Sequence, residues 1–183
     1  MVLRIYGNRR LKTVPGDKTR PTTARVREAV FNICQGTVAG SRWLDLCAGN
    51  GAMGAEALCR GASAVVGIEQ SGLACQVIRQ NWQRVAQVDQ TYRVIAGDVR
   101  QQLAPLAGQA FDFIYFDPPY GSGLYEPVLA AIAHHRLLQP DGTLIVEHNP
   151  DQWQATDCPG LTRLRQKNYG YTHLAFYGHH PSL

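Results

Sequence analysis

Four residues near the middle of the chain, Asp117-Pro118-Pro119-Tyr120, combine groups that could hold a planar substrate. They follow the apolar run Phe113–Phe116, which predicts a buried strand that ends at this point. Two prolines in a row cannot continue a central strand, because proline lacks an N–H, and their carbonyls stay available as acceptors. Asp117 and the Pro118 carbonyl could accept the two hydrogens of an exocyclic amino group, while Tyr120 could stack on the attached ring. The tetrapeptide therefore suits a nucleobase, although a simple turn would also account for it.

A glycine-rich turn lies upstream, between a predicted strand and a predicted helix. The run Trp43–Cys47 reads as a buried strand, and it opens into Ala48-Gly49-Asn50-Gly51. Gly49 and Gly51 would let the backbone approach a ligand closely, and Gly54 would permit tight packing of the helix on the strand. The helix N-terminus adds a partial positive field. The arrangement favours a site for a nucleoside-containing cofactor over a purely structural turn.

Two acidic residues end the next two predicted strands. Glu69 follows Ala64–Ile68, and Asp98 follows Tyr92–Ala96 and a glycine. The carboxyl ends of parallel strands meet at one edge of a sheet, so both carboxylates would face the crevice at the glycine turn. Glu69 is placed to hold a ribose diol, and Asp98 could accept a hydrogen bond from an adenine amino group. Asp98 could equally be the N-cap of the helix that follows it.

The basic residues are concentrated near the N-terminus. The net charge is +4, yet the first 28 residues alone contain eight basic and two acidic residues. A basic segment on a slightly acidic body is typical of an arm that contacts nucleic-acid phosphates, although a solvated terminus has the same composition. We predict a short strand at Arg4–Tyr6 and a polar loop over Gly7–Lys18. The candidates for RNA contact are Arg9, Arg10, Arg20, Arg25 and Arg27.

A helix is predicted to join this arm to the body. Thr22 or Thr23 would cap its N-terminus, and three apolar residues then recur at helical spacing. Arg25 and Arg27 lie off the apolar face, so the helix should pack against the body and display both arginines outward. The apolar residues are Val26, Val30 and Ile33.

Length and composition indicate one globular domain over residues 1–183, of which residues 1–36 form the basic arm and helix. The chain is 45% hydrophobic and 17% charged, and it contains no apolar run as long as a membrane span. Its start lacks the apolar core of a secretory signal, so we expect a cytoplasmic protein. Five scattered cysteines form no Cys-x-x-Cys pair, and the histidines lack metal-ligand spacing, so we expect no metal.

Strands alternate with helices through most of the chain and are followed by a hairpin. This order predicts an α/β fold with a doubly wound sheet, parallel except for an antiparallel C-terminal hairpin at one edge. The remaining predicted elements are helices at about Leu73–Ala86 and Glu126–Leu138, a strand at Thr143–Glu147, and hairpin strands at Leu161–Asn168 and Tyr171–Tyr177.

The order of these motifs resembles that of S-adenosylmethionine-dependent methyltransferases that act on amino nitrogens. The matching segments are Asp45-Leu46-Cys47-Ala48-Gly49-Asn50-Gly51, Glu69, Asp98 and Asp117-Pro118-Pro119-Tyr120. More narrowly, the chain resembles the bacterial 16S rRNA guanine-N2 methyltransferase family. That resemblance covers nearly the whole chain and is strongest in Arg4-Ile5 with Gly7, Arg20–Ile33, and Glu56-Ala57-Leu58 with Arg60-Gly61-Ala62. The chain departs from the family at Asn50, where serine is usual, and at Ala24, where an acid is common.

The resemblance implies a Rossmann-like class I methyltransferase that binds S-adenosylmethionine and methylates N2 of a guanine in 16S rRNA, at a site of the guanine 966 type. The methionine moiety would lie over Gly49–Gly51, the ribose at Glu69 and the adenine near Asp98, with the sulfonium methyl facing Asp117. The partner would be ribosomal RNA within a small-subunit assembly intermediate. We expect the enzyme to act as a monomer without a metal.

The expected catalysis depends on orientation. The amino nitrogen of guanine is a poor nucleophile because its lone pair is delocalised into the ring. Hydrogen bonds to Asp117 and the Pro118 carbonyl would aim that lone pair at the methyl group for in-line displacement. Aligning two bound reactants supplies roughly 7–11 kcal/mol of the barrier, so no strong base is required. The base must leave its stack to enter the site, with Tyr120 as the stacking platform.

Three other functions fit parts of the sequence. An adenine-N6 methyltransferase acting on DNA or RNA would share Asp117-Pro118-Pro119-Tyr120, although the chain leaves little room for a sequence-reading domain. A dinucleotide oxidoreductase could use the glycine turn and Glu69, but it would leave that tetrapeptide and the basic arm without a role. A non-catalytic RNA-binding module would explain the arm but not the cofactor crevice.

Overall fold

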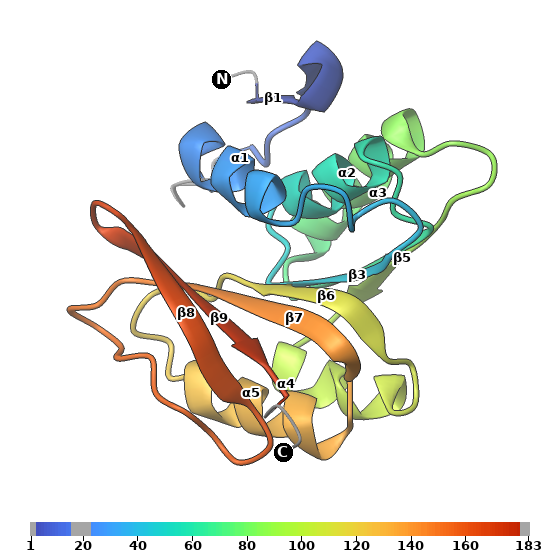
Figure 1. Ribbon diagram of the computed structural model, residues 1–183. Helices are drawn as coiled ribbons and strands as arrows, with labels where there is room; N and C mark the ends of the chain where they lie inside the picture. The colour runs from blue at the N-terminus through green and yellow to red at the C-terminus, as the bar shows by residue number, and fades with distance from the viewer. Residues whose placement is uncertain (1–2, 16–22, 180–183) are drawn as a thin grey trace.

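The chain folds around one seven-stranded sheet. Figure 1 presents the computed structural model, which describes residues 3–15 and 23–179. The strands from β5 to β7 run parallel, and the C-terminal hairpin extends the sheet antiparallel to β7, so the predicted fold class is confirmed. In sheet order the strands are β5 (Thr91–Ala96), β4 (Ala64–Glu69), β3 (Arg42–Leu46), β6 (Phe111–Phe116), β7 (Leu138–His148), β9 (Thr172–Gly178) and β8 (Thr162–Tyr169).

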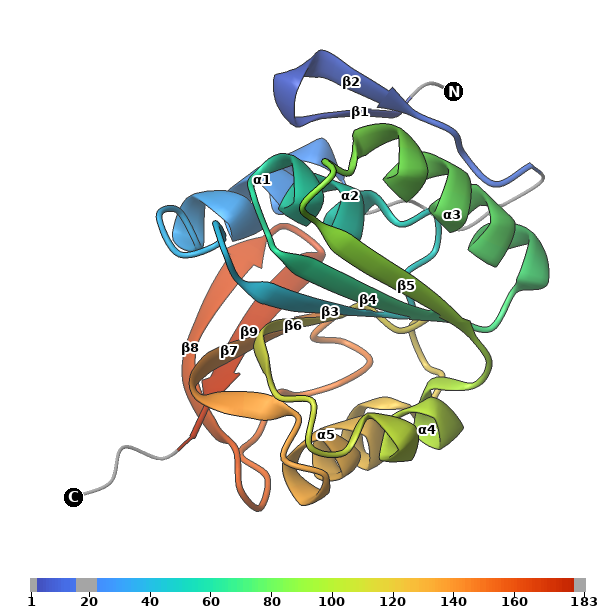
Figure 2. The same ribbon diagram turned by 90° about the vertical axis from the view of Figure 1, so that its right-hand side faces the viewer.

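Helices cover both faces of this sheet. Figures 1 and 2 show α1, α2 and α3 on one face and α4 and α5 on the other. Within the described ranges, no helix has the length and hydropathy needed to cross a membrane. The helices are α1 (Ala24–Ile33), α2 (Ala52–Cys59), α3 (Gly72–Val85), α4 (Val99–Gln102) and α5 (Tyr125–His134), with a short 3₁₀ turn, η2 (Ala104–Leu106), after α4.

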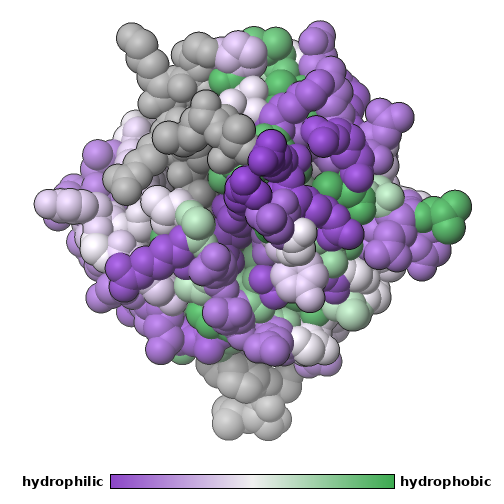
Figure 3. All heavy atoms as spheres, turned by 90° about the horizontal axis from the view of Figure 1, so that it is seen from above, coloured by the Kyte–Doolittle hydropathy of each residue, from purple (hydrophilic) through white to green (hydrophobic). Residues whose placement is uncertain are grey.

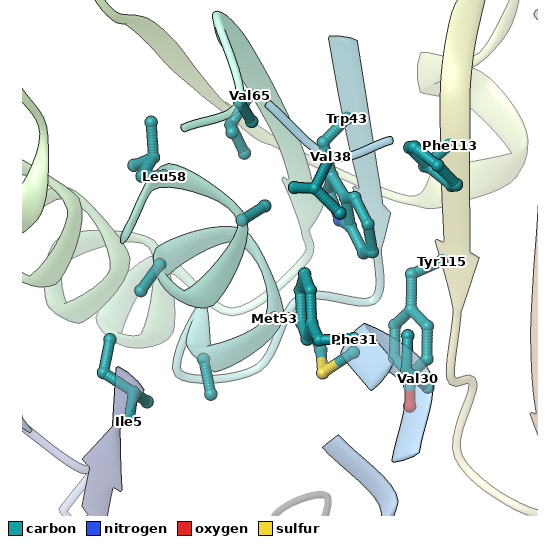
Figure 4. Close-up of a cluster of buried hydrophobic side chains, with 14 of the residues drawn as sticks. Ile5, Val30, Phe31, Val38, Trp43, Met53, Leu58, Val65, Phe113 and Tyr115 are labelled. Atoms are coloured by element: carbon teal, nitrogen blue, oxygen red, sulfur yellow. The ribbon is translucent and has the colours of Figure 1, made fainter. Parts of the chain in front are cut away.

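Alternate residues of the central strands fill two separate cores. Trp43 of β3 and Tyr115 of β6 belong to the core under α1–α3, whereas Leu44 and Phe116 belong to the core over α4 and α5. In the first core, which Figure 4 shows, Phe31 of α1 stacks on Trp43 with ring centroids 4.9 Å apart. This packing fixes β3 and β6 side by side and leaves their carboxyl ends at one edge of the sheet.

The N-terminal segment contains structure that the sequence prediction missed. Leu3–Ile5 forms β1, Tyr6–Asn8 forms a 3₁₀ turn, and Arg9–Leu11 forms β2, which pairs antiparallel with β1. The predicted polar loop is therefore wrong over Arg9–Leu11. Burial explains the difference, because Ile5 and Leu11 are only 5% and 4% exposed and anchor the hairpin in the core of α1–α3.

The predicted end of the fifth helix is also wrong. α5 ends at His134, four residues before the predicted Leu138, and β7 begins at Leu138 rather than Thr143. Arg136 has a φ of 51°, which takes the chain out of the helical path directly after the helix. Leu137 and Leu138 are then buried, so core packing outweighs their preference for a helix.

Candidate functional site

The predicted site residues converge on one large cavity. It has a volume of about 910 Å³ and lies at the carboxyl ends of β3, β4 and β6. The strand order reverses between β3 and β6, and open α/β sheets bind ligands at such a point. Of the predicted cofactor and catalytic residues, all but Gly51 line the cavity: Asp45, Ala48, Gly49, Asn50, Glu69, Asp98, Asp117, Pro118, Pro119 and Tyr120.

The turn after β3 bends sharply around the cavity. Cys47, a non-glycine residue, has a φ of 60°, and Gly49 has a φ of 57° with open space where a Cβ would lie. A backbone held in this sparsely populated region is a feature that clusters at functional sites. The structure therefore supports close approach of a ligand at Gly49.

Gly51 and Gly54 make room for an indole ring rather than for a ligand. A Cβ on Gly51 would lie 2.8 Å from Nε1 of Trp82, and one on Gly54 would lie 2.3 Å from its ring carbon Cζ2. Trp82, fully buried on α3, also donates a 2.8 Å hydrogen bond from Nε1 to the Gly51 carbonyl. Gly51 therefore packs against α3 and does not line the cavity, whereas Gly54 packs against both α3 and β4, where its Cβ would lie 3.0 Å from Cγ1 of Val65, as expected for tight helix-to-strand packing.

Glu69 holds the glycine turn at the end of β4. Its Oε2 accepts a 2.8 Å hydrogen bond from the Gly49 amide, and its Oε1 accepts one of the same length from the Ser71 amide. A carboxylate oxygen has two lone-pair sites, so each oxygen can still accept a further hydrogen bond. Glu69 can therefore shape the turn and bind a hydroxyl group of a ligand at the same time.

Asp45 is a buried acid beneath the same turn. It is 2% exposed, and its Oδ2 accepts a 3.0 Å hydrogen bond from the Gly54 amide. Burial raises the pKa of this carboxyl to about 8, and the Gly54 amide offsets only part of that rise. A positively charged ligand in the cavity would lower the pKa again and be attracted to the resulting carboxylate.

Asp98 caps α4, which is the second of the two roles open to it from the sequence. Its Oδ1 accepts a 2.9 Å hydrogen bond from the Arg100 amide, and the Arg100 guanidinium pairs with the carboxylate. Hydrogen bonds from the Arg100 side chain, and then from its backbone, lower the pKa of Asp98 to about 2. Asp98 is thus an ionised acceptor on the cavity wall.

The Asp117-Pro118-Pro119-Tyr120 segment lines the same cavity, and the Asp117 amide donates a 3.4 Å hydrogen bond to the Leu46 carbonyl at the end of β3. Tyr120 is 42% exposed at this wall, and the Pro119 carbonyl accepts a 3.1 Å hydrogen bond from Ser122 within a turn. The neighbouring wall contains residues that sequence reasoning missed. They are Tyr115, Glu147, Tyr171 and Thr172. Glu147 follows the apolar run Leu144–Val146, as Asp117 follows Phe113–Phe116, and that pattern could have identified it.

The predicted RNA-contacting arginines separate into two groups. Arg9, Arg10 and Arg25 are exposed, and the Arg25 guanidinium lies 5.9 Å from the ring centroid of Tyr169. Figure 3 looks onto this side of the molecule and shows hydrophilic side chains over much of it. Arg27 is instead 2% exposed, so the prediction that it faces outward is wrong. Arg20 lies outside the described residues.

Arg27 is held by an ion pair inside the molecule. Its Nε lies 3.1 Å from Oε2 of Glu56 on α2, and its Nη2 donates a 2.6 Å hydrogen bond to the Arg4 carbonyl of β1. Oε2 of Glu56 also accepts a 3.1 Å hydrogen bond from the Tyr6 amide. Arg27 therefore joins α1, α2 and the N-terminal hairpin, and it is not placed to contact a phosphate.

Known proteins share both the sequence and the fold. The family model described as "Conserved hypothetical protein 95" matches residues 3–178. "Putative rRNA methyltransferase YlbH" of Bacillus subtilis is 32% identical over 171 residues, 92% of each chain. "Ribosomal RNA small subunit methyltransferase D" of Escherichia coli K12 is 28% identical over 179 residues, 96% of this chain and 89% of that protein. The solved structure titled "Putative methyltransferase yhhF from Escherichia coli" has a TM-score of 0.84 and 29% identity over 98% of each chain.

The family match covers nearly all of the described chain, and the resemblance expected from the motifs is confirmed by these relatives. The chain therefore belongs to the Conserved hypothetical protein 95 family, which the names of its relatives identify as a family of rRNA methyltransferases.

Proposed function

We propose that the protein transfers a methyl group from S-adenosylmethionine to N2 of a guanine in 16S rRNA, at a site of the guanine 966 type. One observation carries the proposal: a single cavity joins the glycine turn and Glu69 to the Asp117-Pro118-Pro119-Tyr120 segment. The names of the relatives support ribosomal RNA as the substrate. The choice of guanine N2 rests on the sequence resemblance and on the acceptors around Asp117.

The residues at the glycine turn fit S-adenosylmethionine. Gly49 leaves open space for the methionine moiety, and the Glu69 carboxylate can still accept hydrogen bonds from a ribose diol. Asp45 provides a buried carboxyl that would favour the positive charges of the methionine amine and the sulfonium. Asp98 is an ionised acceptor that could take a hydrogen bond from the adenine amino group.

The second half of the cavity would orient the base. When bound, S-adenosylmethionine supplies an electrophilic methyl group. Asp117 and the Pro118 carbonyl would accept the amino hydrogens of guanine and so fix the direction of its nitrogen lone pair. Tyr120 would stack on the ring after the base has left the RNA helix. Orientation of this kind accounts for most of the required acceleration, since the proton on the methylated nitrogen is lost easily afterwards.

We also propose that a single domain over residues 1–183 carries out the reaction as a monomer. An enzyme for ribosomal RNA would act in the cytoplasm, on an assembly intermediate of the small subunit. Such a substrate presents its own folded shape, so a separate sequence-reading domain is not needed.

Glu69→Gln should raise the dissociation constant of S-adenosylmethionine about tenfold or more. Glutamine keeps one acceptor oxygen but turns an NH₂ group toward the Gly49 or Ser71 amide, and it loses the charge that strengthens a bond to the ribose. Isothermal titration calorimetry measures the change. Glu28→Gln, on an exposed position of α1, is the control and should bind normally. Normal binding by Glu69→Gln would remove Glu69 from the cofactor site.

Replacing Arg9, Arg10 and Arg25 together with alanine should weaken RNA binding and flatten its salt dependence. Each lost phosphate contact lowers the slope of log K against log salt by about 0.7–0.9. Affinity for S-adenosylmethionine should not change, because none of the three lines the cavity. Filter binding at several salt concentrations measures the slope.

The control for this triple variant removes the same charge elsewhere. Arg79, Arg84 and Arg93 are exposed on α3 and β5, and their joint replacement by alanine should leave the slope near that of the wild type. If the arm variant also keeps the wild-type slope, the N-terminal arginines are merely solvated.

The proposed reaction is tested by transfer of a labelled methyl group. The acceptors are small ribosomal subunits that lack this methylation, protein-free 16S rRNA and duplex DNA, and the products are digested and analysed as nucleosides. N2-methylguanosine from either RNA is the expected result, and the better acceptor identifies the assembly stage. N6-methyladenine would instead support the adenine-N6 alternative, and absence of transfer to all three would refute methylation of these substrates.

A further inference from the structure

The cavity extends beyond Asp117 toward β7 and β9, where a carboxyl side chain still lacks a role. Glu147 lines this part of the wall, together with Tyr115 and the hairpin residues Tyr171 and Thr172. Glu147 is 5% exposed, and acidic side chains are seldom buried to this degree without partners. Because Glu147 lines the cavity, a ligand bound there could supply a further hydrogen-bond donor.

Strand register places Glu147 beside Asp117. Phe116 of β6 pairs with Val146 of the parallel strand β7, so Asp117 and Glu147 are the next residues at the same level of two adjacent strands. Adjacent strands lie about 4.8 Å apart. Side chains alternate between faces, and Val146 and Phe116 point into the core of α4 and α5. Asp117 and Glu147 therefore share the face of α1–α3, and both line the cavity.

The partner that Glu147 already has occupies only one of its oxygens. The Tyr115 hydroxyl donates a hydrogen bond to Oε2 of Glu147. Burial raises the pKa of Glu147 to about 6, while the hydrogen bond from the Tyr115 hydroxyl favours the ionised form and opposes the rise. An ionised carboxylate is an acceptor only, with further lone pairs on both oxygens. It can therefore accept an N–H from a ligand next to the group held at Asp117.

We propose that Glu147 accepts a hydrogen bond from N1–H of the target guanine and thereby selects guanine over adenine. This inference rests on the proposed function. In guanine, N1–H adjoins the C2 amino group on the same edge of the ring, so an amino group held at Asp117 presents N1–H to a neighbouring acceptor. Adenine has a bare N1, which would place two acceptors against each other with no proton between them.

The test replaces the target guanine by 2-aminopurine, which keeps the C2 amino group but has no hydrogen on N1. Small subunits are reconstituted with ligated 16S rRNA that carries guanine or 2-aminopurine at the nucleotide mapped in the methyl-transfer experiment. The wild type should methylate guanine about tenfold to a hundredfold more efficiently in kcat/KM, because 2-aminopurine leaves a charged acceptor unpaired.

Glu147→Gln should reverse the hydrogen-bonding preference at this position. The glutamine oxygen can still accept from Tyr115, while its NH₂ group can donate to the bare N1 of 2-aminopurine. The variant should lose activity on guanine and gain activity on 2-aminopurine. The ratio of kcat/KM for guanine to kcat/KM for 2-aminopurine should therefore fall at least about tenfold. Glu126→Gln, at an exposed carboxyl on α5, is the matched control and should keep the wild-type ratio.

The outcomes separate this inference from the proposed function. Equal use of the two bases by the wild type overturns the role of Glu147, and this comparison does not depend on whether a variant folds. If Glu147→Gln binds S-adenosylmethionine normally and keeps the wild-type ratio of kcat/KM for the two bases, the proposed role of Glu147 is also overturned. Glu147 is then a structural partner of Tyr115. No transfer to guanine by the wild type refutes the proposed function itself.

Discussion

Replacing Asp117 with alanine is expected to reduce methyl transfer to background while S-adenosylmethionine still binds. The Glu69 carboxylate is held by the Gly49 and Ser71 amides, so loss of the Asp117 side chain leaves these hydrogen bonds at the proposed cofactor site in place. Without the carboxylate, the amino group of the base loses an acceptor that orients its lone pair. Removal of one such preorganised group typically lowers kcat about a hundredfold to a thousandfold, and misalignment adds to the loss. Single-turnover transfer and calorimetric titration of the cofactor measure the two quantities.

Two further variants make this experiment specific. Asp117→Asn retains an acceptor oxygen and should keep part of the activity. Asp112 lies on the same strand at its opposite end, where its Oδ2 accepts a 2.7 Å hydrogen bond from the Arg42 amide. Asp112→Asn should therefore transfer methyl groups normally. If Asp117→Ala loses cofactor binding together with turnover, Asp117 is a structural residue and its orienting role is wrong.

The sequence was most informative where a polar residue directly follows a buried strand. Apolar runs end at Glu69 and at Asp117, and parallel strands bring their carboxyl ends to one edge. Local pattern and a general rule of sheet topology thus suffice to place both residues on one cavity. The same reasoning applies to Glu147, which ends the apolar run of β7 and lines the cavity, although no familiar motif surrounds it.

Contacts between distant segments are what the sequence did not reveal. The space around Gly51 and Gly54 is taken by Trp82, which belongs to another helix. The N-terminal hairpin depends on burial of Ile5 and Leu11 against α1–α3, which a polar and basic segment does not suggest locally. A single sequence gives the spacing of residues along an element but not the partner of a side chain across the core.

Arg27 shows the largest consequence of such a distant contact. Helical spacing puts Arg27 next to the apolar face of α1. It cannot indicate that Arg27 forms an ion pair with Glu56 of α2. Removing one partner of a buried ion pair costs about 3–5 kcal/mol, because the other charge is left uncompensated. Arg27→Ala and Glu56→Ala should each lower the free energy of unfolding by about this amount, as measured by urea denaturation. That is a large share of the roughly 5–15 kcal/mol that stabilises a typical domain.

The third member of this cluster provides the control. Arg60 also pairs with Glu56, at 2.9 Å, but its side chain is 21% exposed and the pair spans one helical turn. Arg60→Ala should therefore cost no more than about 1 kcal/mol. In a double-mutant cycle, Arg27→Ala with Glu56→Ala should cost less than the sum of the single changes. If Arg27→Ala is instead as stable as the wild type and flattens the salt dependence of RNA binding, Arg27 contacts a phosphate. Arg25 and Arg27 would then both belong to the RNA-binding surface of α1.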